Sequence, residues 1–204
     1  MEYLLTSSPI PGMVLWIIVY ISDYYMTLSI AKAYKDFDTI KFEKSMELTP
    51  QFQKDVDGQV RVSRRHITLL LLITLLILIF WYITVGYFSW TWLYSFFLGL
   101  LILLEAAVHM RHFRNWYQIR VLRKEGGITG SIIFSQRFSY LTSAFDLYAF
   151  AVLFFLFFLW TFSFFFLGGA IACFRVGLNH SGLAKKTISQ PVPSTSEHAD
   201  SSSG

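Results

Sequence analysis

Cysteine and charge are both scarce in this sequence. Cys173 is the single cysteine, so neither an internal disulfide nor a metal cluster held by several thiolates can form. Charged residues make up 15% of the 204 residues, against about 25% in soluble domains. Long stretches have no charge at all. This is typical of membrane-spanning helices, because a charge at the centre of such a helix costs about 2.5–3.5 kcal/mol. The sequence therefore predicts an integral membrane protein.

Long apolar stretches take the place of the missing charge, and hydrophobic residues make up 54% of the chain. A spanning helix needs about 20 mostly apolar residues. The region 142–178 is too long for one straight span, because it would measure about 55 Å as a helix against a hydrocarbon core of about 30 Å. We therefore divide it near residues 160–163, with one long tilted helix as the alternative. The prediction is an all-α polytopic bundle of five spans, or four if the region is undivided, and the five spans are residues 12–33, 67–85, 91–110, 142–160 and 164–178.

Basic residues are unevenly distributed between the connecting segments. Residues 32–66 contain eight Lys or Arg, residues 111–141 contain six, and the turn at 86–90 contains none. By the positive-inside rule both basic segments face the cytoplasm, so five spans place the N-terminus outside and the C-terminus inside. The net charge of +4 thus indicates lipid headgroups as a partner and gives no reason to expect nucleic acid. Residues 1–180 are expected to form the transmembrane domain, and the Ser- and Pro-rich residues 181–204 a disordered tail.

Three acids fall inside the expected spans: Asp23, Glu105 and Asp146. Ionisable residues at membrane depth are costly and often functional. Glu105, His109 and His112 follow one another at four and three residues, so they lie within about 60° on one helix face. A carboxylate and two imidazoles on one face can bind a divalent metal or pass a proton. These three residues are therefore the predicted metal ligands, although their spacing matches neither the Glu-x-x-His pattern of di-iron bundles nor the His-Glu-x-x-His pattern of zinc proteases.

The expected topology places these acids and histidines at one depth, in the cytoplasmic half of the bilayer. Tyr20 and Thr27 share a helix stripe with Asp23 and would add hydroxyl groups. Arginines at the same level could hold a phosphate or a lipid headgroup. The predicted polar cluster is Asp23, Glu105, His109, His112 and Asp146, and the predicted headgroup contacts are Arg65, Arg111 and Arg114.

Each residue of the cluster also has an ordinary structural explanation. Asp146 could belong to a cap at the start of its helix. His109 and His112 could simply extend toward lipid headgroups from the end of a span. Glu105 could pair with an arginine, and Asp23 could bond to a hydroxyl of a neighbouring helix.

Small residues mark the last expected span, where Gly168, Gly169, Ala172 and Cys173 form two overlapping small-x-x-x-small patterns. Such patterns favour close helix packing, either within the chain or with another subunit, a homo-oligomer included. No nucleophile motif, phosphate loop or nucleotide fingerprint occurs, which favours functions other than catalysis. Three functions stay open: proton- or metal-linked transport through the cluster, a scaffold or accessory subunit of a membrane complex, and a membrane enzyme acting on lipid headgroups.

Overall fold

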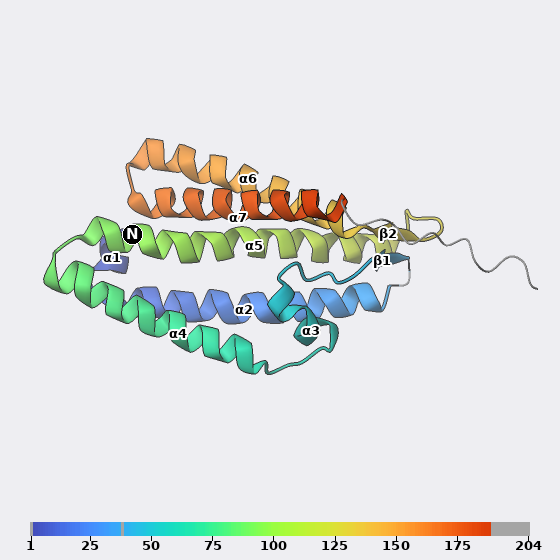
Figure 1. Cartoon of the computed structure of the whole chain (residues 1–204), viewed down its shortest axis with the longest axis horizontal. Helices are drawn as coiled ribbons and strands as arrows, with labels where there is room; N and C mark the ends of the chain where they lie inside the picture. Colours follow the sequence, from blue (N-terminus) through green and yellow to red (C-terminus); the bar gives the residue numbers. More distant parts are fainter. Residues whose placement is uncertain (1, 38, 189–204) are drawn as a thin grey trace, which may run out of the picture.

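Long helices lying side by side along one axis form this protein (Figure 1). The computed structural model describes residues 2–37 and 39–188. The all-α bundle is confirmed, and two short strands were not expected. In chain order the elements are α1 (Glu2–Thr6), α2 (Pro9–Lys35), β1 (Ile40–Phe42), α3 (Pro50–Asp57), α4 (Arg64–Trp81), the π-helical turn η1 (Tyr82–Tyr87), α5 (Thr91–Glu125), β2 (Ile132–Phe134), α6 (Gln136–Thr161) and α7 (Phe164–Ile188).

Four of the described helices are long and apolar enough to cross a membrane: α2, α4 continued by η1, α5 and α6. Apolar side chains such as Leu71, Leu75, Val152 and Leu156 are exposed along α4 and α6. A hydrocarbon phase would cover these faces, since the bundle leaves them without a protein partner. The helices thus fit an integral membrane protein, with α7 packed against them as a fifth long helix.

The long apolar region at the end of the chain is two helices, as predicted. α6 ends at Thr161 and α7 begins at Phe164. Phe162 makes the turn with a left-handed backbone (φ 53°), and its N–H donates to the carbonyl of Phe158. A left-handed non-glycine residue is uncommon, and because Phe162 adopts this backbone, the turn forms without a Gly or Pro to mark it in the sequence.

α7 continues further than the sequence indicates. It ends at Ile188, whereas the span was expected to end at residue 178 and the tail to begin at residue 181. Leu183 and the buried Ala184 pack against Leu48 and Tyr140, and this apolar contact explains why the helix continues. Residues 181–188 are therefore helical, and the rest of the expected tail, 189–204, lies outside the described residues.

Small residues let α7 lie against α5 at very short range. A Cβ atom added at Gly99 would overlap the backbone carbonyl of Phe165, and one added at Gly168 would overlap the backbone of α5. Gly169 lies against a leucine of α5, and Ala172 is buried. The small-residue face is thus occupied within the chain, which is one of the two alternatives left open by the sequence.

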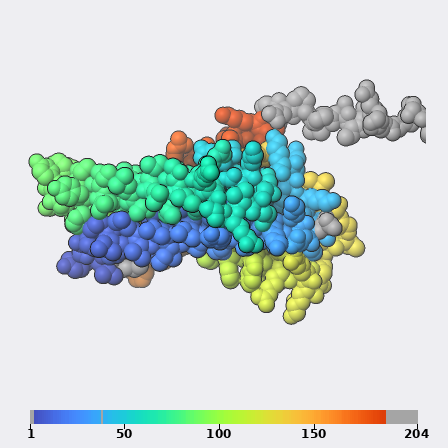
Figure 2. All heavy atoms as spheres, turned by 90° about the horizontal axis from the view of Figure 1, so that it is seen from below, coloured from blue at the N-terminus to red at the C-terminus, as the bar shows by residue number. Residues whose placement is uncertain are grey.

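The helix directions divide the bundle into two unlike ends. α2, α5 and α7 run one way, while α4 and α6 run the other way (Figure 1). The α4–α5 and α6–α7 turns share one end with the N-terminus. The two basic connecting segments lie at the other end, where β1 and β2 form a parallel pair with Ile40 opposite Ile132. Figure 2 shows these segments together, in light blue and yellow, at one end of the molecule.

The interior changes character along α5. Tyr94, Leu98 and Ile102 follow one another along one face and are buried against Trp16 and Ile77 of the neighbouring helices. On the next turns of α5 the same face carries Glu105, His109 and His112. One half of the bundle is therefore closed by apolar packing, and the half nearest the basic segments contains polar groups.

Candidate functional site

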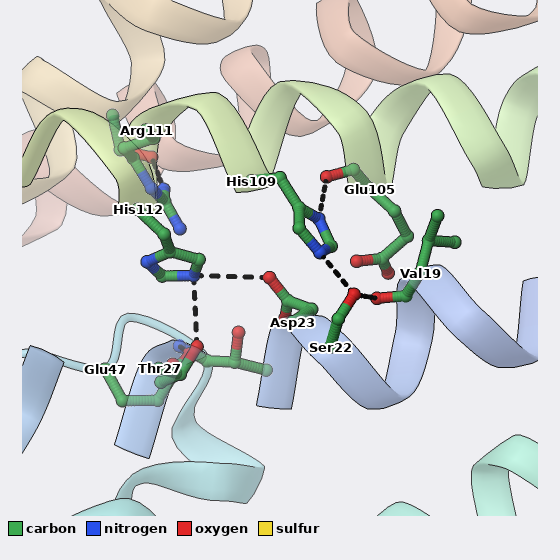
Figure 3. Close-up of polar contacts among 11 residues, drawn as sticks. Val19, Ser22, Asp23, Thr27, Glu47, Glu105, His109, Arg111 and His112 are labelled. Carbon is green, nitrogen blue, oxygen red and sulfur yellow. Dashed lines mark hydrogen bonds and ion pairs between the residues drawn. The ribbon is translucent and has the colours of Figure 1, made fainter. Parts of the chain in front are cut away.

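The packing of α2 against α5 brings four of the five predicted cluster residues together (Figure 3). Donor atoms of Asp23, Glu105 and His109 all lie within 4.8 Å of one another. Nε2 of His112 lies 3.3 Å from Oδ1 of Asp23. Because these side chains come from two helices far apart in the sequence, the site exists only when the bundle is assembled.

Asp146 lies apart from this group. Its Oδ1 accepts a hydrogen bond from Nη1 of Arg114 at 2.7 Å, so the two form an ion pair between α6 and α5. α6 begins at Gln136 with Ser135 as its cap, so Asp146 does not cap the helix either. The physical reason is that α7 lies against both α5 and α6 (Figure 1) and holds α6 away from α2. Neither predicted role of Asp146, in the cluster or in a cap, is seen.

His109 is held in a defined orientation by its own helix. Its Nδ1 lies 2.8 Å from the backbone carbonyl of Glu105, and a carbonyl can only accept, so Nδ1 carries the proton. The lone pair of the neutral ring is then on Nε2, which lies 2.7 Å from Oγ of Ser22. Ser22 also lies 3.0 Å from the carbonyl of Val19, so its hydroxyl proton has two acceptors. We did not predict Ser22, which precedes Asp23 but lies off the stripe that Tyr20 and Thr27 share with it.

His112 contacts Asp23 but is not one of the three clustered donors. Its Nε2 lies 3.0 Å from Oγ1 of Thr27, and the side chain is almost fully buried, with 4% of the residue exposed. Its Nδ1 is buried without a partner. The structure therefore groups Asp23, Glu105 and His109, whereas the sequence pattern predicted Glu105, His109 and His112. The hydroxyl group expected from Thr27 is indeed at the site.

A cavity of about 220 Å³ adjoins the clustered side chains. His66 of α4 lies on its wall, stacked between Tyr20 and Tyr24 with ring centroids 4.2 Å from each. Nε2 of His66 is buried without a hydrogen-bond partner, and Oδ1 of Asp23 has only the 3.3 Å contact with Nε2 of His112. Buried polar atoms without partners are rare in native proteins, and a ligand, ion or water in the cavity would satisfy them.

Two further polar residues of the cavity, Glu47 and His180, were not predicted from the sequence, for different reasons. Glu47 lies in the segment between β1 and α3, and no sequence pattern connects it with the helices. His180 lies beyond the expected end of the last span. Since it follows the cavity residue Val176 by four, a longer α7 would have placed both on one face.

The three predicted headgroup arginines have three different surroundings. Arg65 is exposed and donates through Nη1 to the carbonyl of Gln51 at 2.8 Å. Arg114 is paired with Asp146. Arg111 lines the cavity and donates to Oγ of Ser143. Of the three, Arg111 alone faces the clustered acids.

Charge balance shows what the cluster can bind. Two carboxylates that lie close together inside a protein are stabilised by a cation between them. Carboxylate oxygens of Asp23 and Glu105 lie within 4.8 Å of one another, and Arg111 lines the wall of the same cavity. Two carboxylates and an imidazole suit a divalent metal of the Zn²⁺, Mn²⁺ or Fe²⁺ type. A backbone carbonyl that orients the other ring nitrogen of His109 is a usual feature of metal-binding histidines.

Comparison with known proteins gives no independent assignment of this site. No protein-family model, curated protein or solved structure matches the chain. What the site can do follows from its side chains and their surroundings alone.

Proposed function

We propose that this chain binds a divalent metal ion inside its helix bundle and carries out metal-linked transport, with protons as the competing occupants. The observation that carries the proposal is the convergence of Asp23, Glu105 and His109, whose donor atoms lie within 4.8 Å of one another. A metal ion would neutralise both acids and use the lone pair of His109 at the same time. A proton would neutralise one acid only.

The distances require a modest adjustment for such an ion. Three donor atoms bound to one metal at about 2.0–2.2 Å cannot all be more than about 3.8 Å apart. A separation of up to 4.8 Å therefore closes with side-chain shifts of about one ångström. Ser22 would leave Nε2 of His109 and keep a hydrogen bond to the carbonyl of Val19, which lies 3.0 Å away.

The charge distribution supports one orientation of the bundle. The two basic connecting segments lie at the same end, and by the positive-inside rule this end is cytoplasmic. With α7 as a fifth span, the N-terminus is outside and the C-terminus inside. The metal site then lies in the cytoplasmic half of the bilayer, and the ion enters past Glu47.

A membrane enzyme acting on lipid headgroups is the second candidate, and the apolar half of the bundle favours it. Trp16, Tyr94 and Leu98 are buried between the cluster and the far end. The polar cavity thus has no continuation across the bundle in this conformation. In an enzyme of this kind the bound metal would activate a water molecule, and Arg111 would hold the phosphate of the substrate.

Metal binding by the purified protein tests the proposal. We expect one Zn²⁺ or Mn²⁺ ion per chain by mass spectrometry of the metal content and by calorimetric titration. Asp23→Asn and Glu105→Gln should each weaken binding at least 100-fold, more than the 10–100-fold cost of removing a group that only supports a ligand. Asp146→Asn is the matched control, since it removes another acid at membrane depth that is bound to Arg114 instead.

Two outcomes decide between the readings. Metal uptake by proteoliposomes that is lost in Glu105→Gln would support transport, while stoichiometric metal without uptake would favour the enzyme. A folded wild-type protein that binds neither metal at millimolar concentration, or equal weakening in Asp146→Asn, would overturn the metal site. The remaining proposed function would then be that of a scaffold or accessory subunit of a membrane complex.

A further inference from the structure

A second cavity, of about 300 Å³, lies at the polar end of the bundle and shares Arg111, His112 and Glu47 with the wall of the first. It is formed by α5, the first turns of α6, the paired strands and the segment that follows β1. Its volume is at the lower end of the range found for small-molecule sites. The metal proposal makes no use of the residues that line this cavity alone.

One positive and one negative side chain line this cavity without pairing. In the described part of the chain, neither Arg111 nor Glu47 takes part in an ion pair. Arg111 has five N–H donors and one hydrogen bond, to Ser143. One oxygen of Glu47 accepts the N–H of Thr49 at 2.7 Å. Arg114 also lines the cavity, but its charge is balanced by Asp146, so the cavity offers one net cation and one net anion.

Four aromatic side chains also line this cavity. Tyr34 and Phe42 are 4.9 Å apart between ring centroids, Phe42 and Phe134 are 5.7 Å apart, and Phe134 and Phe138 are 5.3 Å apart. Ring faces attract ammonium groups, and quaternary ammonium ligands are often held in this way. Glu47 together with the aromatic row therefore suits a positively charged group.

The depth of the cavity fits a lipid. The apolar part of α5 ends at Met110, and Arg111 follows it directly, at the level where phospholipid phosphates lie. Phe138 lines the cavity from the first turn of α6 and is 52% exposed on the outside of the bundle. A lipid in the bilayer could thus place its headgroup in the cavity and leave its acyl chains against the apolar face of α6.

We propose that this cavity binds the headgroup of a zwitterionic phospholipid. The phosphate lies against Arg111, with the side-chain amide of Asn115 as a further hydrogen-bond donor. The ammonium group lies against Glu47 and the aromatic row. A zwitterion satisfies both unpaired charges, whereas an anionic headgroup would satisfy Arg111 and be repelled by Glu47.

Native mass spectrometry of the purified full chain tests this site. The protein is exposed to phosphatidylethanolamine, phosphatidylcholine and phosphatidylglycerol with the same acyl chains. We expect retention of the two zwitterionic lipids to exceed that of phosphatidylglycerol about tenfold or more. Arg111→Gln should reduce retention of all three lipids, while Glu47→Gln should remove the preference. Arg65→Gln and Glu125→Gln are matched controls, since these exposed charges do not line the cavity.

Several results would overturn the proposal. If the wild type retains phosphatidylglycerol as well as the two zwitterionic lipids, the site recognises only the phosphate. Displacement of the lipid by an equal concentration of glycerophosphoethanolamine would mean that the ligand is a soluble phosphate ester. If Glu47→Gln still prefers zwitterionic lipids over phosphatidylglycerol, Glu47 does not bind the ammonium group. If Arg111→Gln does not fold, Arg111→Lys and Glu47→Gln test the lipid site instead. A chelator is present in every experiment, so that lipid retention does not depend on metal binding.

Discussion

Oγ of Ser22 lies 2.7 Å from Nε2 of His109 and 3.0 Å from the carbonyl oxygen of Val19. The hydroxyl group has one proton and two acceptors, so it can donate to only one of them at a time. When the lone pair of His109 is free, Ser22 can donate to it, and when a metal takes that lone pair, Ser22 can turn to Val19. A metal ion at the proposed site would therefore compete with Ser22 for His109.

Ser22→Ala should tighten metal binding. One hydrogen bond contributes about 0.5–1.5 kcal/mol, so the dissociation constant for Zn²⁺ should fall by up to about tenfold. Ser29→Ala is the matched control, because Ser29 lies on the same helix and is bonded to the carbonyl of Tyr25. Weaker binding in Ser22→Ala would instead make the hydroxyl a metal ligand, contrary to the proposed site.

Metal affinity should rise with pH. Binding must displace any proton shared by Asp23 and Glu105, and each displaced proton changes the affinity about tenfold per pH unit. Calorimetry in buffers of different ionisation enthalpy counts the protons released. Glu105→Asp keeps a carboxylate and should keep the dependence. Affinity that stays constant between about pH 5 and pH 8 would speak against proton competition.

The ion pair of Arg114 and Asp146 should support the fold and leave the metal site alone. The Arg114 side chain is 40% exposed and that of Asp146 is 16% exposed, so screening reduces the effect below that of a fully buried pair. We expect Asp146→Asn to lower the free energy of unfolding by about 1–3 kcal/mol. The double variant with Arg114→Gln should be less destabilised than the sum of the single changes. Additive changes in melting temperature would show that the pair contributes nothing.

Two glycines of α7 should respond to alanine in opposite ways. Gly168→Ala places a methyl group against the backbone of α5, and overpacking of this kind costs about 1–3 kcal/mol or more. Gly182→Ala adds a methyl group where no atom lies within 4 Å, so higher helix propensity should stabilise the protein by up to about 1 kcal/mol. Thermal unfolding in detergent measures both. Equal melting temperatures would contradict the close contact of α5 and α7.

The orientation of the bundle is testable by cysteine labelling. In a Cys173→Ala background, new cysteines at Ser89 and Thr161 should react with an impermeant maleimide from outside the cell. A cysteine at Lys54 should react only after the membrane is opened. All three positions are exposed. Labelling at Ser89 and Thr161 from opposite sides would contradict the proposed arrangement of the spans.

The helices could be predicted because the bilayer sets their length and composition. The long apolar region had to be divided, since one helix would have extended far beyond the hydrocarbon core. The place of the turn was correct, but its chemistry could not be foreseen, because Phe162 adopts a left-handed backbone without glycine. The strands were missed because three-residue pairs have no periodicity to read.

The site was predictable where one helix determines it. The spacing of Glu105 and His109 along α5 placed both on one face, and the structure joins them to Asp23 of α2. Depth alone did not determine which neighbour each residue meets. Asp146 lies on α6, and its partner depends on how α7 packs, which no spacing within α6 reveals.

The parallel pairing of β1 with β2 also orders events in time. Ile40 pairs with Ile132, and these residues are 92 positions apart (132 minus 40). A ribosome adds about 5–20 residues per second, so β1 waits roughly 5–20 s for its partner to be synthesised. Phe42 of β1 and Phe134 of β2 both line the second cavity, so its wall is complete only after β2 has been synthesised.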